Sequence, residues 1–378
     1  MRIIRLEPFL MQIPLLVSFK HASAERRESF SIWVEAHDEE GNVGFGEGCP
    51  RLYVTGEDAK SCRDFWKRYQ RVVMESITSL ETLQLLEREL EKEIDKAPAC
   101  WCAIEMAVLD LMSRRAGRTL EEVLGLAKLD SSFRFTAVLG DQPIKQFTSQ
   151  LQQYVRLGFE QFKIKLSGEA ERDRLKFQAL EAAGIAADHV RVDANNLWNS
   201  ALDALEHLVP FADAFSAVEE PVAAYDYSAL NRLAEQLGKP VILDESFLRQ
   251  QDFSQLSEYS DRWIINIRVS KMGGLLRSLM IIEEARRRDI RVVVGAQVGE
   301  SSLVTRYALP VATAAGALLF GQEGAFGTHL LVGDVVEPPL MFGQGGMLEL
   351  DDMPYGRRPM PVVRPDVYLT PLFGERDR

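Results

Sequence analysis

Short apolar runs alternate with amphipathic segments along the last two thirds of the chain. Eight such runs lie at 133–139, 161–166, 190–193, 214–219, 241–244, 263–267, 291–294 and 317–320. Each run has the length of a buried strand, and the segments between the runs carry apolar residues at helical spacing. Strands that alternate with helices predict a (β/α)8-type barrel over residues 128–325. A doubly wound sheet is less favoured, because no Gly-x-Gly-x-x-Gly motif follows any run.

The first 127 residues have strands before helices. Alternating runs predict strands at 3–16, 29–37 and 43–47, with a turn at 38–42 and a polar loop at 18–28. Helical spacing follows at 57–73, 79–95 and 98–116. This order predicts an α+β domain over residues 1–127. In the Gly- and Pro-rich segment 326–378, an apolar run at 347–350 is expected to return to this domain as a strand.

Composition and charge restrict the classes of partner. The net charge of −12 argues against nucleic acid and against an anionic membrane surface. No stretch is long and apolar enough for a membrane span, and the N-terminus lacks the apolar core of a signal peptide. The four cysteines, at 49, 62, 100 and 102, form neither a disulfide framework nor a zinc pattern. We therefore expect a cytoplasmic protein.

Two lysines stand one residue apart in the second barrel run. In a strand, Lys163 and Lys165 would emerge on the same face, with Phe162, Ile164 and Leu166 on the other. Two ammonium groups in one small volume lower the pKa of each, which makes a lysine usable as a base. The alternative is a solvated lysine pair on an edge strand.

Carboxylates follow the next three runs. Asp193, Glu219 and Asp244 each stand where a parallel strand ends, and the chemistry of such barrels lies at that face. Three carboxylates at one rim repel one another unless a cation lies between them. Because the ligands are all hard oxygens, the pattern predicts Mg²⁺ or Mn²⁺, although a single Asp in this place more often caps a helix.

The sixth run leads to Lys271 and then to Gly273-Gly274. Strands 2 and 6 of an eight-stranded barrel lie on opposite walls. A metal-bound substrate would therefore have Lys165 on one side and Lys271 on the other.

Five motifs in this order resemble the enolase superfamily, in its mandelate racemase/muconate lactonizing subgroup. They are Lys163-x-Lys165, Asp193-x-Asn195, Glu219-Glu220-Pro221, Asp244-Glu245-Ser246 and Lys271-x-Gly273-Gly274. Residues 44–48 and 103–111 also resemble the capping domain of that family. The resemblance implies a modified TIM barrel with an N-terminal α+β capping domain that the C-terminal segment completes.

The resemblance also implies roles for these residues. Asp193, Glu219 and Asp244 would bind Mg²⁺, Lys165 and Lys271 would form the acid/base pair, and Lys163 would assist by its charge. The reaction implied is abstraction of a proton α to a carboxylate through an enediolate intermediate. The substrate would be a small carboxylate, and relatives assemble as homo-oligomers.

The net reaction is less defined than the proton abstraction. The sequence lacks a histidine at the ends of runs 6 and 7, unlike mandelate racemase, and residues 323–327 lack the Asp-x-Asp of dipeptide epimerases. Segments 326–331 and 334–336 look closer to muconate cycloisomerases. We therefore expect a muconate-cycloisomerase-like isomerase, a cycloisomerase or a racemase/epimerase. The alternatives are an o-succinylbenzoate synthase-like dehydratase, an N-acylamino acid racemase or a dipeptide epimerase.

Further candidates would surround the substrate. The loops 18–28 and 50–56 would cover the barrel mouth in such a protein, and the basic residues of the first loop could meet a second carboxylate. The candidate residues beyond the lysines and metal ligands are Asn195, Glu245, Gln297, Glu300, Tyr53 and His21. Two other classes stay open: an aldolase that uses a Schiff-base lysine, and a barrel that binds without turnover.

Overall fold

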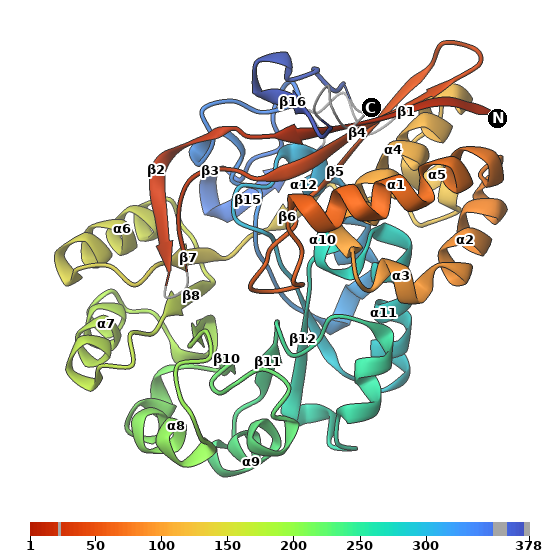
Figure 1. Ribbon diagram of the computed structural model, residues 1–378. Coiled ribbons are helices and arrows are strands. Elements are labelled where there is room, and N and C mark those ends of the chain that lie inside the picture. The colour runs from red at the N-terminus through yellow and green to blue at the C-terminus, as the bar shows by residue number, and fades with distance from the viewer. Residues whose placement is uncertain (22–23, 351–360, 374–378) are drawn as a thin grey trace.

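The computed structural model describes residues 1–21, 24–350 and 361–373, and the description of side chains leaves out residues 17–26. Figure 1 shows an α+β domain that sits above a barrel of strands surrounded by helices. The β2–β3 hairpin runs down from the upper domain beside the barrel (Figure 1). No helix among the described residues is long and apolar enough to cross a membrane.

The upper domain is built on a four-stranded antiparallel sheet. Its strands are β1 (Ile3–Met11), β4 (Ser31–Asp38), β5 (Val43–Gly48) and β16 (Leu369–Pro371), in the order β16-β1-β4-β5. The predicted turn between β4 and β5 is present. The expected loop at 18–28 is wrong, because the chain forms a hairpin from β2 (Pro14–His21) and β3 (Ala24–Glu28). The sequence of β3, Ala-Glu-Arg-Arg-Glu, lacks the alternation that marks a half-buried strand.

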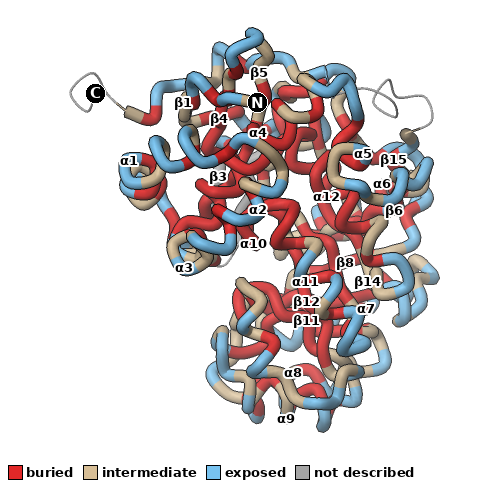
Figure 2. The backbone as a smooth tube through the Cα atoms, turned by 90° about the vertical axis from the view of Figure 1, so that its right-hand side faces the viewer, coloured by how far each residue is buried: buried red, intermediate tan, exposed pale blue. Residues whose placement is uncertain are grey.

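The helices of this domain pack beside the sheet. They are α1 (Ala59–Ser76), α2 (Leu80–Glu89), α3 (Glu91–Ile94), α4 (Pro98–Ala116) and α5 (Leu120–Leu124). The single helix predicted at 79–95 is divided into α2 and α3 at Leu90, whose φ and ψ are −96° and 8°. Helix α4 is apolar on nearly every side and is buried along most of its length, as the tube in Figure 2 shows.

The barrel has the predicted eight parallel strands in chain order. They are β7 (Ala137–Leu139), β8 (Phe162–Lys165), β9 (Val190–Asp193), β10 (Ala217–Glu219), β11 (Val241–Leu243), β12 (Trp263–Ile267), β13 (Arg291–Val294) and β14 (Leu319–Gln322). The N–H of Thr136 donates to the carbonyl of Gln322 at 2.7 Å and joins the last strand to the first. The barrel predicted from the apolar runs is confirmed.

Helices do not follow every strand. The α-helices around the barrel are α6 (Ile144–Arg156), α7 (Ala170–Ala182), α8 (Ala201–Leu208), α9 (Tyr227–Leu237), α10 (Val269–Met272), α11 (Leu275–Arg287) and α12 (Ser302–Ala315). Between β11 and β12 the described chain has only the 3-10 turns Gln250–Gln255 and Ser260–Arg262. The prediction of a helix there is wrong, because these polar residues lack a continuous apolar stripe.

The C-terminal segment divides its contacts between the two domains. The predicted strand near 347–350 exists as β15 (Met347–Glu349), but it pairs with β6 (Ser132–Arg134) next to the barrel. The expected return of this run to the first domain is therefore wrong. An alternating pattern predicts that a strand forms, but it does not predict which strand it pairs with. The strand that joins the upper sheet is β16, which pairs with β1.

Glu57 fixes the start of α4 and makes stability depend on pH. Its carboxylate accepts from the N–H groups of Ala99 at 3.0 Å and Cys100 at 3.3 Å, and from the Thr55 hydroxyl at 2.7 Å. Burial raises the pKa of Glu57 from 4.5 to about 7. Between these values the folded state binds more protons than the unfolded state, so the free energy of unfolding falls as pH rises.

We expect Glu57→Gln to remove up to about 3 kcal/mol of this pH dependence, because the amide keeps an acceptor for the two N–H groups and cannot ionise. Urea denaturation of both proteins from about pH 4 to pH 8 measures the difference. Parallel stability curves for the wild type and the variant would contradict the assignment.

Candidate active site

The two lysines of β8 point into the barrel on one face, as the alternation predicted. Lys163 Nζ lies 3.0 Å from Asp193 Oδ2 and 2.7 Å from Glu219 Oε2. Lys165 Nζ lies 2.7 Å from Asp193 Oδ2 and 2.7 Å from Asn195 Oδ1. The strand register explains these contacts, because Lys165 is opposite Asp193 and Asp193 is opposite Glu219.

Lys163 is a fixed cation. Burial lowers its pKa, but the charges of Asp193, Glu219 and Glu323 outweigh burial, and the pKa is raised above its usual value. The expectation that lysine crowding lowers the pKa of both lysines is thus wrong for Lys163. The carboxylates around it decide the direction, and they come from strands distant in sequence.

A buried network behind β8 holds the main chain of Lys165. The Lys176 ammonium, on α7, donates to the Lys165 carbonyl at 2.8 Å and to Asp173 Oδ1 at 2.9 Å. Asp173 also accepts from the N–H groups of Ser167 at 2.9 Å and Gly168 at 3.1 Å. These contacts close the turn after the strand and fix the direction in which the Lys165 side chain leaves it.

Asp244, which follows β11, pairs with two cations that follow the neighbouring strand β12. A guanidinium N–H of Arg268 donates to Asp244 Oδ2, and Lys271 Nζ donates to Asp244 Oδ1 at 3.0 Å. Burial raises the pKa of Asp244, but Arg268 and Lys271 outweigh this and lower it overall. Arg268 also donates to Gln297 Oε1 at 2.9 Å.

Lys271 contacts the predicted metal ligand Asp244, but it lies in a short helix and does not end a strand. The strand β12 ends at Ile267, and Lys271 lies in the short helix α10 with a side chain that is 0% exposed. Its ammonium donates to the Asp244 carbonyl at 2.8 Å, to the Asp244 carboxylate and to the Asn266 carbonyl at 2.6 Å. Arg268 stands directly after β12 and was not among the predicted site residues.

Three other polar residues of the barrel interior were also missed. Glu323 follows β14 and accepts from Arg191 at 2.5 Å, and its Oε1 lies 3.3 Å from Lys163 Nζ. Asn266 donates to Glu219 Oε1 at 3.1 Å. Two of them could have been predicted, because residues two apart in a strand lie on the same face. Arg191 is two residues before Asp193, and Asn266 is two residues before Arg268.

The remaining candidates surround Arg268 with one exception. Tyr53 and Glu245 lie within electrostatic reach of the guanidinium. Glu300 accepts from the Gln297 N–H at 2.8 Å, and burial raises its pKa to about 8. The side chain of His21 lies outside the described part of the chain, so the structure does not place it.

The three predicted metal ligands supply the kind of donor atom that a divalent cation binds, and each is paired with a lysine or an arginine. Asp193, Glu219 and Asp244 bring carboxylate oxygens from adjacent strand ends, as Mg²⁺ requires. Burial raises the pKa of Glu219 to about 7, even though the charge of Lys163 opposes the shift. Several buried polar atoms around the site have no hydrogen-bond partner among the described residues: Asn266 Oδ1, Glu245 Oε2, Gln297 Nε2 and Arg268 Nε. A bound ligand or ion would satisfy buried polar atoms of this kind.

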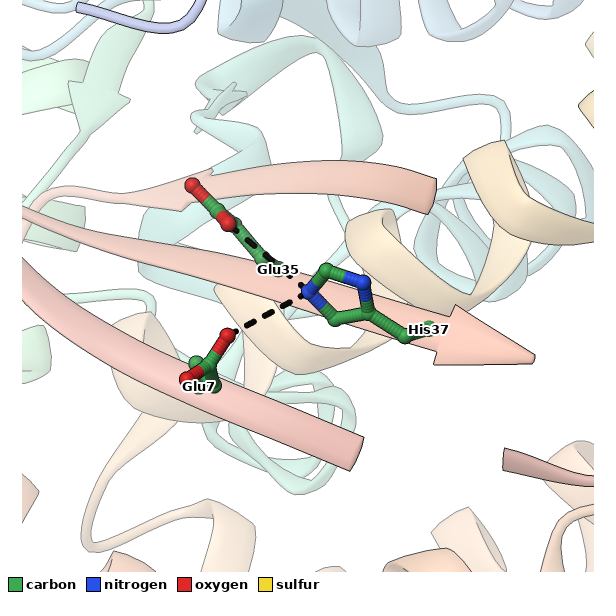
Figure 3. A group of neighbouring side chains, drawn as sticks. All are labelled: Glu7, Glu35 and His37. Atoms are coloured by element: carbon green, nitrogen blue, oxygen red, sulfur yellow. Dashed lines mark ion pairs between the residues drawn. The ribbon is translucent and has the colours of Figure 1, made fainter. Parts of the chain in front are cut away.

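A second group of ligand-type atoms lies on the upper sheet. Glu7, Glu35 and His37 bring one atom each within 4.8 Å of one another, and Figure 3 shows the imidazole between the two carboxylates. Arg5 Nε lies 3.2 Å from Glu7 Oε2, and Arg364 Nε donates to Glu35 Oε1 at 2.5 Å. Each carboxylate of this group is thus paired with an arginine, and the group lies on the upper sheet and not at the barrel rim.

Comparison with known proteins agrees with this geometry. The family described as enolase C-terminal domain-like matches residues 146–354. An L-Lys-D/L-Arg epimerase of Methylococcus capsulatus is 28% identical over 93% of this chain and 96% of its own. A dipeptide epimerase of Enterococcus faecalis, solved with Mg and the dipeptide L-Leu-L-Tyr, is 26% identical with a TM-score of 0.77 over 92% of this chain and 97% of its own. A 2-chloromuconate cycloisomerase of Rhodococcus opacus shares the fold, with 24% identity and a TM-score of 0.84 over 96% of this chain and 97% of its own.

The barrel with its capping domain therefore defines the class of protein. Since the family match covers more than half of the chain, the protein belongs to the enolase superfamily.

Proposed function

We propose that the protein is an isomerase that removes a proton α to the carboxylate of a small substrate, through an enediolate intermediate. One observation carries this proposal: Lys165 and the carboxylates of Asp193, Glu219 and Asp244 converge at the C-terminal rim of one barrel. Family membership and two epimerase relatives support it.

Each side chain has a role in this chemistry. Mg²⁺ held by Asp193, Glu219 and Asp244 would supply Lewis acidity at the substrate carboxylate. Lys165 Nζ would take the α-proton, and Asn195, its contact at 2.7 Å, would orient the amine. Lys163 and Arg268 would stay charged and stabilise the negative charge that develops on the substrate oxygens.

The substrate is a small carboxylate. Relatives named for dipeptide epimerisation support a carboxylate on an amino acid residue, and the segment after β14 supports a muconate-type cycloisomerisation. An aldolase is less well supported, because a Schiff-base lysine does not need three carboxylates beside it. The homo-oligomeric state, the cytoplasmic location and the domain boundaries stay predictions.

Removal of the metal tests the proposal. We expect exchange of the α-hydrogen in D₂O for at least one of three probes, muconolactone, L-Lys-L-Arg or L-Leu-L-Tyr, when Mg²⁺ is present. A chelator should abolish this exchange, and Asp193→Asn should lower both exchange and Mg²⁺ affinity at least about 100-fold, because one charged ligand is lost. Asp188→Asn, which changes an exposed carboxylate at the start of the same strand, is the matched control. Exchange that survives the chelator, or a covalent adduct trapped on Lys165 by borohydride, would overturn the proposal.

A further inference from the structure

We propose that Arg51 is a positioning residue that ties the loop 50–56 to the segment 297–301, so that this part of the barrel mouth is preformed. The two segments come from different domains, because the loop follows β5 of the upper domain and the segment lies between β13 and α12 of the barrel. The inference rests on the proposed function and deepens it, since Tyr53 in the loop and Gln297 in the segment are candidate substrate contacts.

The Arg51 side chain is buried and bonds main-chain carbonyls of both domains. The residue is 1% exposed, and its Nη1 donates to the carbonyls of Phe30 at 2.7 Å and Pro50 at 2.8 Å. Its Nη2 donates to the carbonyl of Val298 at 2.7 Å, in the segment that follows β13. A guanidinium holds its donors in one plane, so these bonds fix the three carbonyls relative to one another. Arg51 therefore bridges the loop and the barrel.

The burial of this charge points to the same role. Arg51 Nε is buried and has no hydrogen-bond partner among the described residues. The positive charge acts on the carboxyl groups of Glu57 and Glu300, whose pKa values it lowers against the effect of burial. An apolar side chain would fill the same space without the cost of removing a charge from water. The need to join carbonyls from two domains explains why an arginine stands there.

The main chain of Arg51 closes the loop that its side chain anchors. The Arg51 carbonyl accepts from the N–H groups of Val54 at 3.0 Å and Thr55 at 2.9 Å. The Thr55 hydroxyl donates to Glu57 Oε2 at 2.7 Å, and Glu57 also accepts from the N-terminal turn of α4. Tyr53 therefore lies in a turn that is fixed at both ends.

The segment 297–301 is also packed directly against the upper domain. Gly299 has a φ of +83°, and a β-carbon there would lie 3.1 Å from the β-carbon of Ser29. The N–H of Ser301 donates to Glu47 Oε2 at 3.3 Å, and the Ser301 hydroxyl donates to the same oxygen. These contacts keep the segment in the place where the guanidinium reaches it.

Hydrogen–deuterium exchange of main-chain amides in the Mg²⁺-loaded protein, read by mass spectrometry, tests the bridge without a substrate. In the wild type, amides of the loop 50–56 should exchange at least about tenfold more slowly than in an unstructured peptide of the same sequence. Arg51→Met and Arg51→Lys should each raise amide exchange at least about tenfold in both segments and leave α8 unchanged. Arg51→Lys keeps the charge but lacks the planar donors that reach both domains. Arg156→Met, at the exposed end of α6, is the matched control.

The kinetics of α-hydrogen exchange give a second readout, with a probe that the wild type turns over. Arg51→Lys should raise KM at least about fivefold and change kcat less than about twofold, because a disordered loop weakens binding of substrate and transition state alike. Lys165 and the predicted metal ligands lie on other strands, β8 to β11, or directly after them. A variant that is only partly folded would instead lose kcat at an unchanged KM.

The outcomes distinguish this inference from the proposed function. Unprotected amides in the loop of the wild type would overturn the inference, and this result needs no variant to fold. Unchanged amide exchange in Arg51→Lys, or a fall in kcat at an unaltered KM, would overturn it as well. If the wild type turns over no probe, the proposed function fails, and amide exchange still decides whether Arg51 holds the two segments together.

Discussion

Lys165→Ala is expected to lose about 10²- to 10⁴-fold in turnover, the contribution of a positioned general base. The ammonium of Lys165 contacts Asp193 and Asn195 at the mouth of the barrel, so its removal takes away the amine nearest to the substrate space. Binding of Mg²⁺ should persist, because Asp193 keeps its contact with Lys163 at 3.0 Å. The loss should therefore appear in the rate of α-hydrogen exchange rather than in metal affinity.

A second substitution at the same position separates charge from proton transfer. Lys165→Arg keeps the positive charge beside Asp193 but cannot act as a base, so we expect it to be as inactive as Lys165→Ala. Lys145→Ala, an exposed lysine of α6, is the control for the general effect of losing a lysine. Exchange rates in D₂O and circular dichroism of each variant are the measurements. Retained activity in Lys165→Arg would show that Lys165 acts only through its charge.

The period-of-two rule explains which site residues the sequence revealed. Lys163 and Lys165 share a face of β8, and the barrel register brings Asp193 and Glu219 to that face. Their contacts depend on strand alternation and strand order alone, both of which follow from the apolar runs. The same rule applied to β12 would have selected Asn266 and Arg268.

The sequence misplaced the end of the strand before Lys271, while the role of Lys271 stays a prediction. The segment 263–267 continues into residues that can extend a strand as well as start a helix, and alternation does not mark the boundary. One turn of helix at Val269–Met272 follows the strand and brings the Lys271 ammonium to Asp244. Glu323 was missed for a related reason, since the pairing of β13 with β14 shifts register between Val292 and Val293.

Long-range pairing limited the prediction of the fold. The apolar runs located the eight barrel strands because each is buried on both faces. The strand β3 is polar, and the partners of β15 and β16 lie more than 200 residues away in sequence. Such pairings depend on the tertiary packing of the whole domain, and the local sequence of each strand does not indicate its partner.

Gly46→Ala is expected to destabilise the protein by about 3 kcal/mol or more, because it forces apart two elements of the upper domain. A β-carbon at Gly46 would overlap the carbonyl oxygen of Ala103 in α4, and Gly44 and Gly48 meet the same helix in the same way. The overlap is with main-chain atoms of a buried helix, which cannot rotate aside as a side chain does. The strand β5 and α4 would have to separate.

Separation of β5 from α4 should lower activity as well as stability. The strand β5 leads into Cys49, whose N–H donates to Ser270 Oγ of α10 at 2.6 Å, and then into the loop that carries Tyr53. Gly140→Ala is the matched control, because a β-carbon there meets no atom within 4 Å. Denaturation midpoints and exchange rates should fall together in Gly46→Ala and stay near wild type in Gly140→Ala. Equal stability of the two variants would mean that β5 can move away from α4 without loss of core packing.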